Sequence, residues 1–133
     1  MTFAWNADDV AQVWRSMLEP GADHYKYVDW PLSNYGSASF DDIQLNGKSV
    51  GASMFAGYSY NERSMLSLGI VDADIDIGTE VTLIWGEPNG GTEKATVERH
   101  KQLEIRAVVS PVPYASVVRE SYAADGWRAA GKV

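Results

Sequence analysis

The residues best suited to chemistry lie together in one short polar segment, Tyr-Ser-Tyr-Asn-Glu-Arg at positions 58–63. An arginine can bind a carboxylate through two parallel hydrogen bonds, and tyrosines can stack on a ring or donate a hydrogen bond. The simpler interpretation is that the arginine pairs with a neighbouring acid and the tyrosines pack on the rim of the fold. The segment could also contact another domain, since Tyr and Arg are enriched at interfaces. The candidate cofactor-binding or interdomain residues are Tyr58, Tyr60, Glu62 and Arg63.

Other residue types that often act in catalysis lack the spacing that catalysis requires. His24 and His100 titrate nearest to neutrality, but no His-x-His or His-x-x-x-His pair is present, so no zinc site is predicted. We expect both histidines at solvated strand ends and rank a small histidine-dependent enzyme last among the functions considered. Ser59 lacks the second glycine of a nucleophile elbow and precedes a strand, so it is not predicted to be a nucleophile. No catalytic residue is assigned.

Two further patterns resemble ligand loops but fail on inspection. The Asp-x-Asp-x-Asp run that begins at Asp72 has Ile77 and Leu83 where a calcium loop needs Gly and Glu. We therefore expect an acidic turn at 72–78. The glycine-rich segment 86–91 is followed by neither Lys-Ser/Thr nor a helix, so it is predicted to be a hairpin turn and not a phosphate loop.

Composition limits the class of protein. The 133 residues are enough for one domain, and 45% hydrophobic with 22% charged residues is typical of a globular protein. A net charge of −7 argues against nucleic acid or a membrane as a partner, because both favour a basic surface. The absence of cysteine excludes disulfides and thiolate metal sites and indicates a cytoplasmic location.

One helix is expected, over residues 7–18. Asn6 is a favourable N-cap, and two acidic residues follow it in the first turn, where the helix dipole stabilises negative charge. Apolar residues then recur at helical spacing and form a single stripe that needs a packing partner. A Pro-Gly pair at 20–21 ends the pattern.

The rest of the chain is predicted to be short strands joined by turns. Asn46-Gly47 is a strong hairpin signal, and 57–63 is expected to be a loop. The predicted strands are 24–28, 39–45, 48–56, 64–71, 80–85, 93–99 and 103–109. We therefore predict a mainly β fold, an antiparallel Greek-key-like barrel of about six strands with one N-terminal helix. Residues 1–133 would form a single domain, with the barrel at about 24–110 and a tail at 115–133.

Three stretches carry a resemblance to a known family: GKSVGASMFAGYSYNERSMLSLGIVD (47–72), GTEVTLIWGE (78–87) and PVPY (111–114). Together they resemble the C-terminal barrel domain of the glycine-cleavage T-protein-like, tetrahydrofolate-dependent methyltransferases. T-proteins usually have Ser-Pro where this chain has Ser59 followed by Tyr-Asn-Glu-Arg. That variant is more similar to the aromatic O-demethylase branch, which acts on vanillate, syringate or similar compounds. The helix at 7–18 and segment 26–35 also resemble the part that leads into its barrel.

The resemblance implies a domain that is not catalytic by itself. In that family, large N-terminal domains carry the main contacts to tetrahydrofolate and substrate, and none of that sequence is present here. A basic residue that follows Pro-Phe-Tyr in T-proteins is also missing, because Ala115 and Ser116 follow Tyr114. Arg106 and Arg119 are the candidates to replace it.

The resemblance thus implies an accessory or lid barrel in a tetrahydrofolate-dependent O-demethylase or aminomethyltransferase-like protein. Its partners would be N-terminal folate-binding domains or a separate subunit that carries them. The alternative is a stand-alone binding or assembly module, which pairs with a separately encoded folate-binding domain or self-associates through the helix and the tyrosine segment.

Overall fold

The structure, a computed structural model, describes residues 1–21, 23–28, 40–91 and 98–122. The first elements are β1 (Thr2–Trp5), α1 (Ala7–Met17), β2 (Asp41–Leu45), β3 (Lys48–Ser59) and β4 (Ser64–Val71). They are followed by β5 (Glu80–Trp85), the 3-10 turn η1 (Pro88–Gly91), β6 (Leu103–Ser110) and the π-helical turn η2 (Val118–Tyr122). Most of the strand predicted at 93–99 and the end of the predicted tail lie outside the described residues. No helix of the described chain is long and apolar enough to span a membrane.

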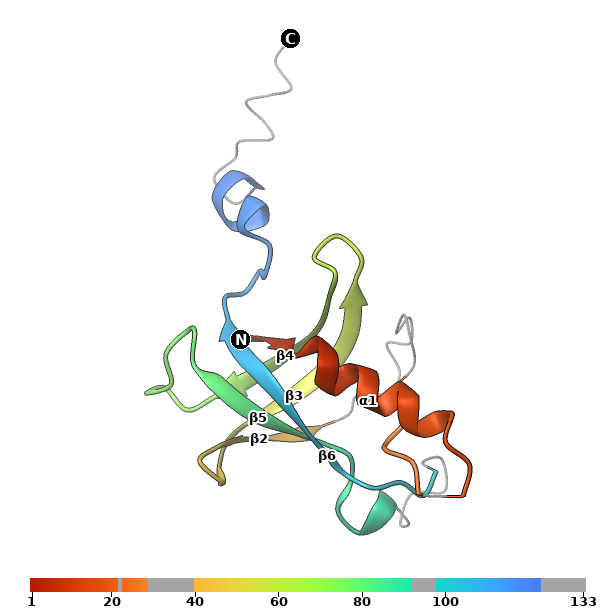
Figure 1. Ribbon diagram of the computed structural model, residues 1–133. Coiled ribbons are helices and arrows are strands. Elements are labelled where there is room, and N and C mark those ends of the chain that lie inside the picture. The colour runs from red at the N-terminus through yellow and green to blue at the C-terminus, as the bar shows by residue number, and fades with distance from the viewer. Residues whose placement is uncertain (22, 29–39, 92–97, 123–133) are drawn as a thin grey trace.

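The six strands form a closed antiparallel barrel in the order β1-β4-β3-β2-β5-β6 (Figure 1). Strands β2, β3 and β4 follow one another as hairpins, and the next strand along the chain, β5, returns to pair with β2. This order is that of a Greek key. The predicted mainly β fold with a six-stranded barrel and one N-terminal helix is confirmed.

Strand β1, which the sequence did not predict, closes the barrel. It is only four residues long, and it pairs with β4 on one side and β6 on the other. The prediction of a strand at 24–28 is wrong, because Tyr25 makes only an isolated bridge with Lys101. Four residues are too few for a periodicity to be recognised, so the signal of β1 is lost beside that of the helix that follows it.

Helix α1 begins and ends close to the predicted positions. Asn6 Oδ1 accepts hydrogen bonds from Asp8 N and Asp9 N at 3.0 and 3.2 Å, which satisfies two free amides of the first turn. Val10 and Val13 are buried on the side that faces the barrel. The helix therefore packs along the outside of the barrel, against β6 and β4 (Figure 1).

Side chains fill the interior of the barrel. The indole rings of Trp5 and Trp85 meet edge to face with centroids 5.1 Å apart. Two serines are also buried here: Trp5 Nε1 donates to Ser67 Oγ at 3.0 Å, and Ser53 Oγ donates to the same oxygen at 2.7 Å. The largest fully buried apolar side chains are Phe3, Ile43, Leu83, Ile105, Val13 and Val109. A small barrel filled in this way has no internal ligand cavity.

Strand β3 is longer than predicted. It continues through Ser59, so the predicted loop at 57–63 is reduced to a turn at 60–63. The strand is bulged between Met54 and Gly57, and at this bulge Phe55 adopts a left-handed conformation with φ 53°. A positive φ is strained for a large side chain, and such strain is most common at functional positions.

The connection between β5 and β6 differs from the predicted hairpin. Trp85 pairs with Leu103, so the two strands are neighbours. The chain between them includes η1, with Asn89 and Gly90 both at positive φ, and the stretch that lies outside the described residues. The segment 87–91 is thus a turn, as expected, and it lies within a longer connection between the paired strands β5 and β6.

Candidate functional site

The four candidate residues lie at the β3–β4 turn. Tyr58 is in β3, opposite Met65 of β4, and Arg63 precedes β4 with φ 50°. The Arg63 guanidinium carbon lies 3.9 Å from the centre of the Tyr60 ring, which is a cation–π contact. Tyr60 and Glu62 are exposed. Within the described part of the chain, Arg63 makes no ion pair with a neighbouring acid, and its guanidinium lies over the Tyr60 ring instead. The expectation of such a pair is wrong for these residues.

Tyr58 and Arg63 meet at a small hollow between the turn and helix α1. Its volume is about 150 Å³, and it is lined by Trp5, Ala7, Val10, Ala11, Tyr58, Arg63, Ser64 and Met65. The turn and the first turns of α1, which lie far apart in the sequence, thus form one surface. Tyr60 and Glu62 do not line the hollow.

An ion pair holds α1 against the barrel at this place. Asp9 accepts from the Arg106 backbone N at 2.8 Å and from its side chain through Nε and Nη2, both at 2.9 Å. The hydrogen bonds from Arg106 lower the pKa of Asp9 despite the opposing effect of burial, and the bonds to Asp9 raise the pKa of Arg106. The helix wall of the hollow is therefore fixed to β6.

Neither of the two arginines considered as replacements for the missing basic residue is free. Arg106 binds Asp9, and Arg119 Nη1 donates to the backbone carbonyls of Pro113 and Tyr114. Both side chains therefore serve the structure of this chain, which leaves Arg63 as the better-placed cation for contacting a ligand or partner.

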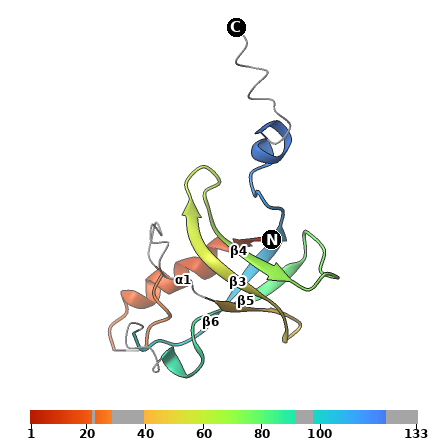
Figure 2. The ribbon, with the colours of Figure 1, turned by 180° about the vertical axis from the view of Figure 1, so that it is seen from behind.

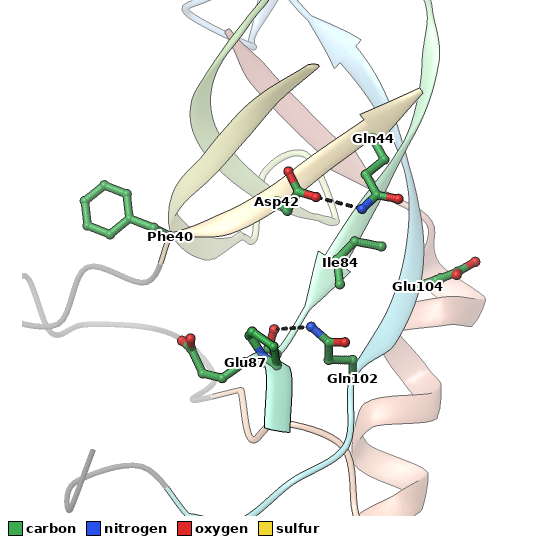
Figure 3. Close-up of a pocket in the computed structure, with 9 residues that line it drawn as sticks. Phe40, Asp42, Gln44, Ile84, Glu87, Gln102 and Glu104 are labelled. Carbon is green, nitrogen blue, oxygen red and sulfur yellow. Dashed lines mark hydrogen bonds between the residues drawn. The ribbon is translucent and has the colours of Figure 1, made fainter. Parts of the chain in front are cut away.

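A second hollow, which the sequence did not suggest, lies on the outside of β2, β5 and β6 (Figure 3). Its volume is about 490 Å³, and the residues around it include three carboxylates, those of Asp42, Glu87 and Glu104. Gln44 Nε2 donates to Asp42 Oδ2 at 2.7 Å, and Gln102 Nε2 donates to the Gly86 carbonyl at 3.1 Å. Figure 3 shows the ring of Phe40 turned away from the other labelled side chains.

Beside this hollow, one end of the barrel contains a buried ion pair. Lys26 Nζ lies 3.0 Å from Asp41 Oδ1 and 4.3 Å from the centre of the Trp85 ring. Gly86 N also donates to Asp41 Oδ1, at 3.2 Å. Lys26 is 8% and Asp41 3% exposed, so both charges of this pair are buried at the end of the barrel.

His100 also differs from its predicted position. It is 4% exposed and not solvated. Its Nε2 accepts from Glu87 N at 2.8 Å, and its Nδ1 lies 2.8 Å from the Glu98 carbonyl, so the ring is neutral and carries its proton on Nδ1. The ring therefore joins two loop segments. His24 is half-buried, with Nδ1 2.8 Å from the Tyr25 carbonyl.

The described residues do not fit tetrahydrofolate, the cofactor that the resemblance implies. Side chains fill the barrel, and the hollow at Tyr58 and Arg63, at about 150 Å³, is below the ~300–1,000 Å³ of small-molecule sites. The larger hollow is within that range, but its carboxylates would repel a ligand that itself carries carboxylates. Within the described ranges, no group of three or more acidic or histidine side chains is placed to hold a metal ion.

Comparison with known proteins gives two informative relatives. Syringate O-demethylase of a Sphingobium species is 46% identical over 129 residues, which are 96% of this chain and 28% of that protein. Sesamin methylene transferase of a Sinomonas species is 35% identical over 125 residues, which are 86% of this chain and 25% of that protein. No protein-family model matches the chain. The chain is thus homologous to one part of syringate O-demethylase, and it spans only about a quarter of the length of the curated relatives it matches.

Proposed function

We propose that this chain is an accessory barrel domain of a tetrahydrofolate-dependent O-demethylase or a closely related one-carbon transferase, and that it is not catalytic alone. The observation that carries the proposal is the extent of the match: 96% of the chain aligns at 46% identity, yet this is only 28% of syringate O-demethylase. The substrate of the whole enzyme would be a methoxylated aromatic compound such as syringate. We also propose that the whole enzyme is glycine-cleavage T-protein-like, that it uses tetrahydrofolate, and that this barrel is its C-terminal domain.

The geometry supports an accessory role. The barrel interior is packed, and the hollows of the described residues do not suit a folate, so these residues offer a partner mainly a surface. We derive no catalytic step for any of its residues. Among the described residues, the two carboxylates with a lowered pKa, Asp9 and Glu98, accept hydrogen bonds from backbone N–H groups of this chain.

Within this proposal, the β3–β4 turn contacts the folate-binding domains. Tyr60 is 66% exposed and supports the Arg63 guanidinium, so the pair presents a cation with an aromatic ring beneath it. Tyr and Arg are the residue types that most often dominate binding at interfaces. Tyr58, Tyr60, Glu62 and Arg63 are therefore proposed as interdomain residues.

A chimera tests the function. This chain replaces the matching segment of the Sphingobium syringate O-demethylase, and demethylation of syringate with tetrahydrofolate is measured. We expect an active chimera, and an inactive enzyme when the segment is deleted. A folded but inactive chimera would refute the proposal. Calorimetric titration of the isolated chain with tetrahydrofolate should show no tight, saturable binding, and such binding would refute its accessory role.

The alternative, a separately encoded assembly module, makes a different prediction. Such a module would bind a folate-binding polypeptide in trans, or itself, as a stable complex in sedimentation.

We further propose that residues 1–133 form one domain. We also propose that the protein is cytoplasmic, and this second proposal rests on the absence of cysteine.

A further inference from the structure

Strand β4 is apolar on the outside of the barrel as well as toward the core, where Met65 is buried. Ser67 faces the interior and is 1% exposed, whereas Leu68 and Ile70 are 47% and 64% exposed. An antiparallel strand with one face in water normally has polar residues on that face. The apolar outer face of β4 departs from this pattern, which indicates that the face is covered in the working protein.

The neighbouring elements extend this surface. Met54 of β3 pairs with Leu68, and Phe55, held at positive φ by the bulge, is 49% exposed beside them. Val112, after β6, is 54% exposed. We call these residues the apolar face: Met54, Phe55, Leu66, Leu68, Ile70 and Val112. Figure 2 shows β3 on the near side of the barrel with no helix in front of it.

The apolar face carries no charge, in contrast to the opposite side of the barrel. The sequence has no charged residue in 49–59 or in 64–71. The outer side chains of β2 and β6 include Asp42, Glu104 and Arg106. Exposed apolar areas bordered by polar residues mark protein contacts, so the two sides of the barrel have different environments.

A hollow at the apolar face is large enough for one anchor side chain. Its volume is about 250 Å³, and Phe55, Leu66, Leu68, Val112 and Tyr114 are among its lining residues. This is below the ~300–1,000 Å³ of small-molecule sites, and a pocket of this size at an interface accepts a single large side chain of the partner. Tyr58 also lines it, so the hollow is continuous with the turn proposed above as an interdomain contact.

We propose that the apolar face docks the folate-binding polypeptide that corresponds to the larger part of syringate O-demethylase, with an apolar side chain of that polypeptide in the 250 Å³ hollow. This inference rests on the proposed function and names its interface. The relatives indicate this occupant. The chain matches only 28% and 25% of their lengths, so most of each relative is further polypeptide that such a face could contact. A second copy of this chain is a poorer occupant, because each copy carries a net charge of −7 and the two repel.

Hydroxyl-radical footprinting tests the interface in the chimera described above. Oxidation of Leu68 and Ile70 should be fast in the isolated chain and several-fold slower in the chimera. Ile77, 57% exposed in the β4–β5 connection, is the internal control and should react equally in both. An active chimera in which Leu68 and Ile70 stay reactive refutes this interface alone. A folded, inactive chimera refutes the proposed function and the inference with it.

A pair of matched substitutions gives an independent measurement. Ile70→Asp should leave the melting temperature of the isolated chain nearly unchanged but lower the melting temperature and activity of the chimera. Ile77→Asp, the same change at similar exposure, should leave both proteins unchanged. Equal effects of the two substitutions in the chimera would overturn the proposal. So would slow oxidation of Leu68 in the isolated chain, or a dimer of this chain that Ile70→Asp dissociates, because the occupant would then be this chain itself.

Discussion

Two glycines in the β3–β4 hairpin should respond in opposite directions to the same substitution. A Cβ atom at Gly69 would lie 2.2 Å from the Ala52 carbonyl oxygen and 2.4 Å from Phe3 Cε2. One of these atoms is backbone and the other belongs to a fully buried ring, so neither can move away easily. At Gly57, in contrast, a Cβ atom meets nothing within 4 Å.

The magnitudes follow from these distances. Overpacking of a filled core costs ~1–3 kcal/mol, and we expect Gly69→Ala at the upper end, about 2–3 kcal/mol, because the strand pairing must also yield. Gly57→Ala should stabilise the chain by ~0.4–1 kcal/mol, because alanine reduces the conformational entropy of the unfolded state.

Urea unfolding followed by tryptophan fluorescence measures both variants. The indoles of Trp5 and Trp85 report on the core directly, because they lie in the interior. In a thermal scan, a change of ~1 kcal/mol corresponds to roughly 2–8 °C for domains near this size, so the two variants should be well separated. If Gly69→Ala were as stable as the parent chain, or less damaging than Gly57→Ala, the close approach of β1, β3 and β4 would be refuted.

Three more predictions concern the charged groups. Lys26→Met should destabilise the chain by ~3–5 kcal/mol in urea unfolding, because it leaves the carboxylate of Asp41 buried without its cation, and adding Asp41→Asn should restore part of the loss. The stability that Asp9 contributes should be present at pH values above the ordinary carboxyl pKa and lost as the pH falls through the lowered pKa of Asp9. Asp9→Asn should remove this part of the pH dependence of stability. An unchanged pH profile in this variant would contradict the prediction. In the chimera, Arg63→Ala should reduce demethylation without changing the melting temperature, whereas Arg15→Ala, at an exposed ion pair on α1, should change neither.

The sequence predicted the barrel because its main signals are local. The positive φ angles required at Asn46 and Gly47 are found, and the predicted helix and the strands from β2 to β6 agree with the structure to within a few residues. What it missed depends on contacts between distant residues. Strand β1 gains its conformation only by pairing with β4 and β6, and the buried position of His100 depends on Glu87 and Glu98.

The role of the four candidate residues stays a prediction. They lie in and beside one turn, as their places in the sequence require, but only Tyr58 and Arg63 line the hollow, whose other wall is helix α1. The alternation of Leu66, Leu68 and Ile70 predicts that they share a face, yet periodicity cannot say whether that face is inward. The burial of Ser67 shows that the serine faces inward, so Leu66, Leu68 and Ile70 face outward.

The short first strand has a consequence for anyone who shortens this protein. The helix cap at Asn6 makes residues 1–5 look dispensable, but Met1 N donates to the Gly69 carbonyl at 2.7 Å, and its carbonyl accepts from Gly69 N at 2.9 Å. Without β1, the edges of β4 and β6 would lose their common neighbour and present unpaired N–H and C=O groups. Unpaired edges of this kind recruit strands from other molecules, so a version that begins at the helix would aggregate before it lost its secondary structure.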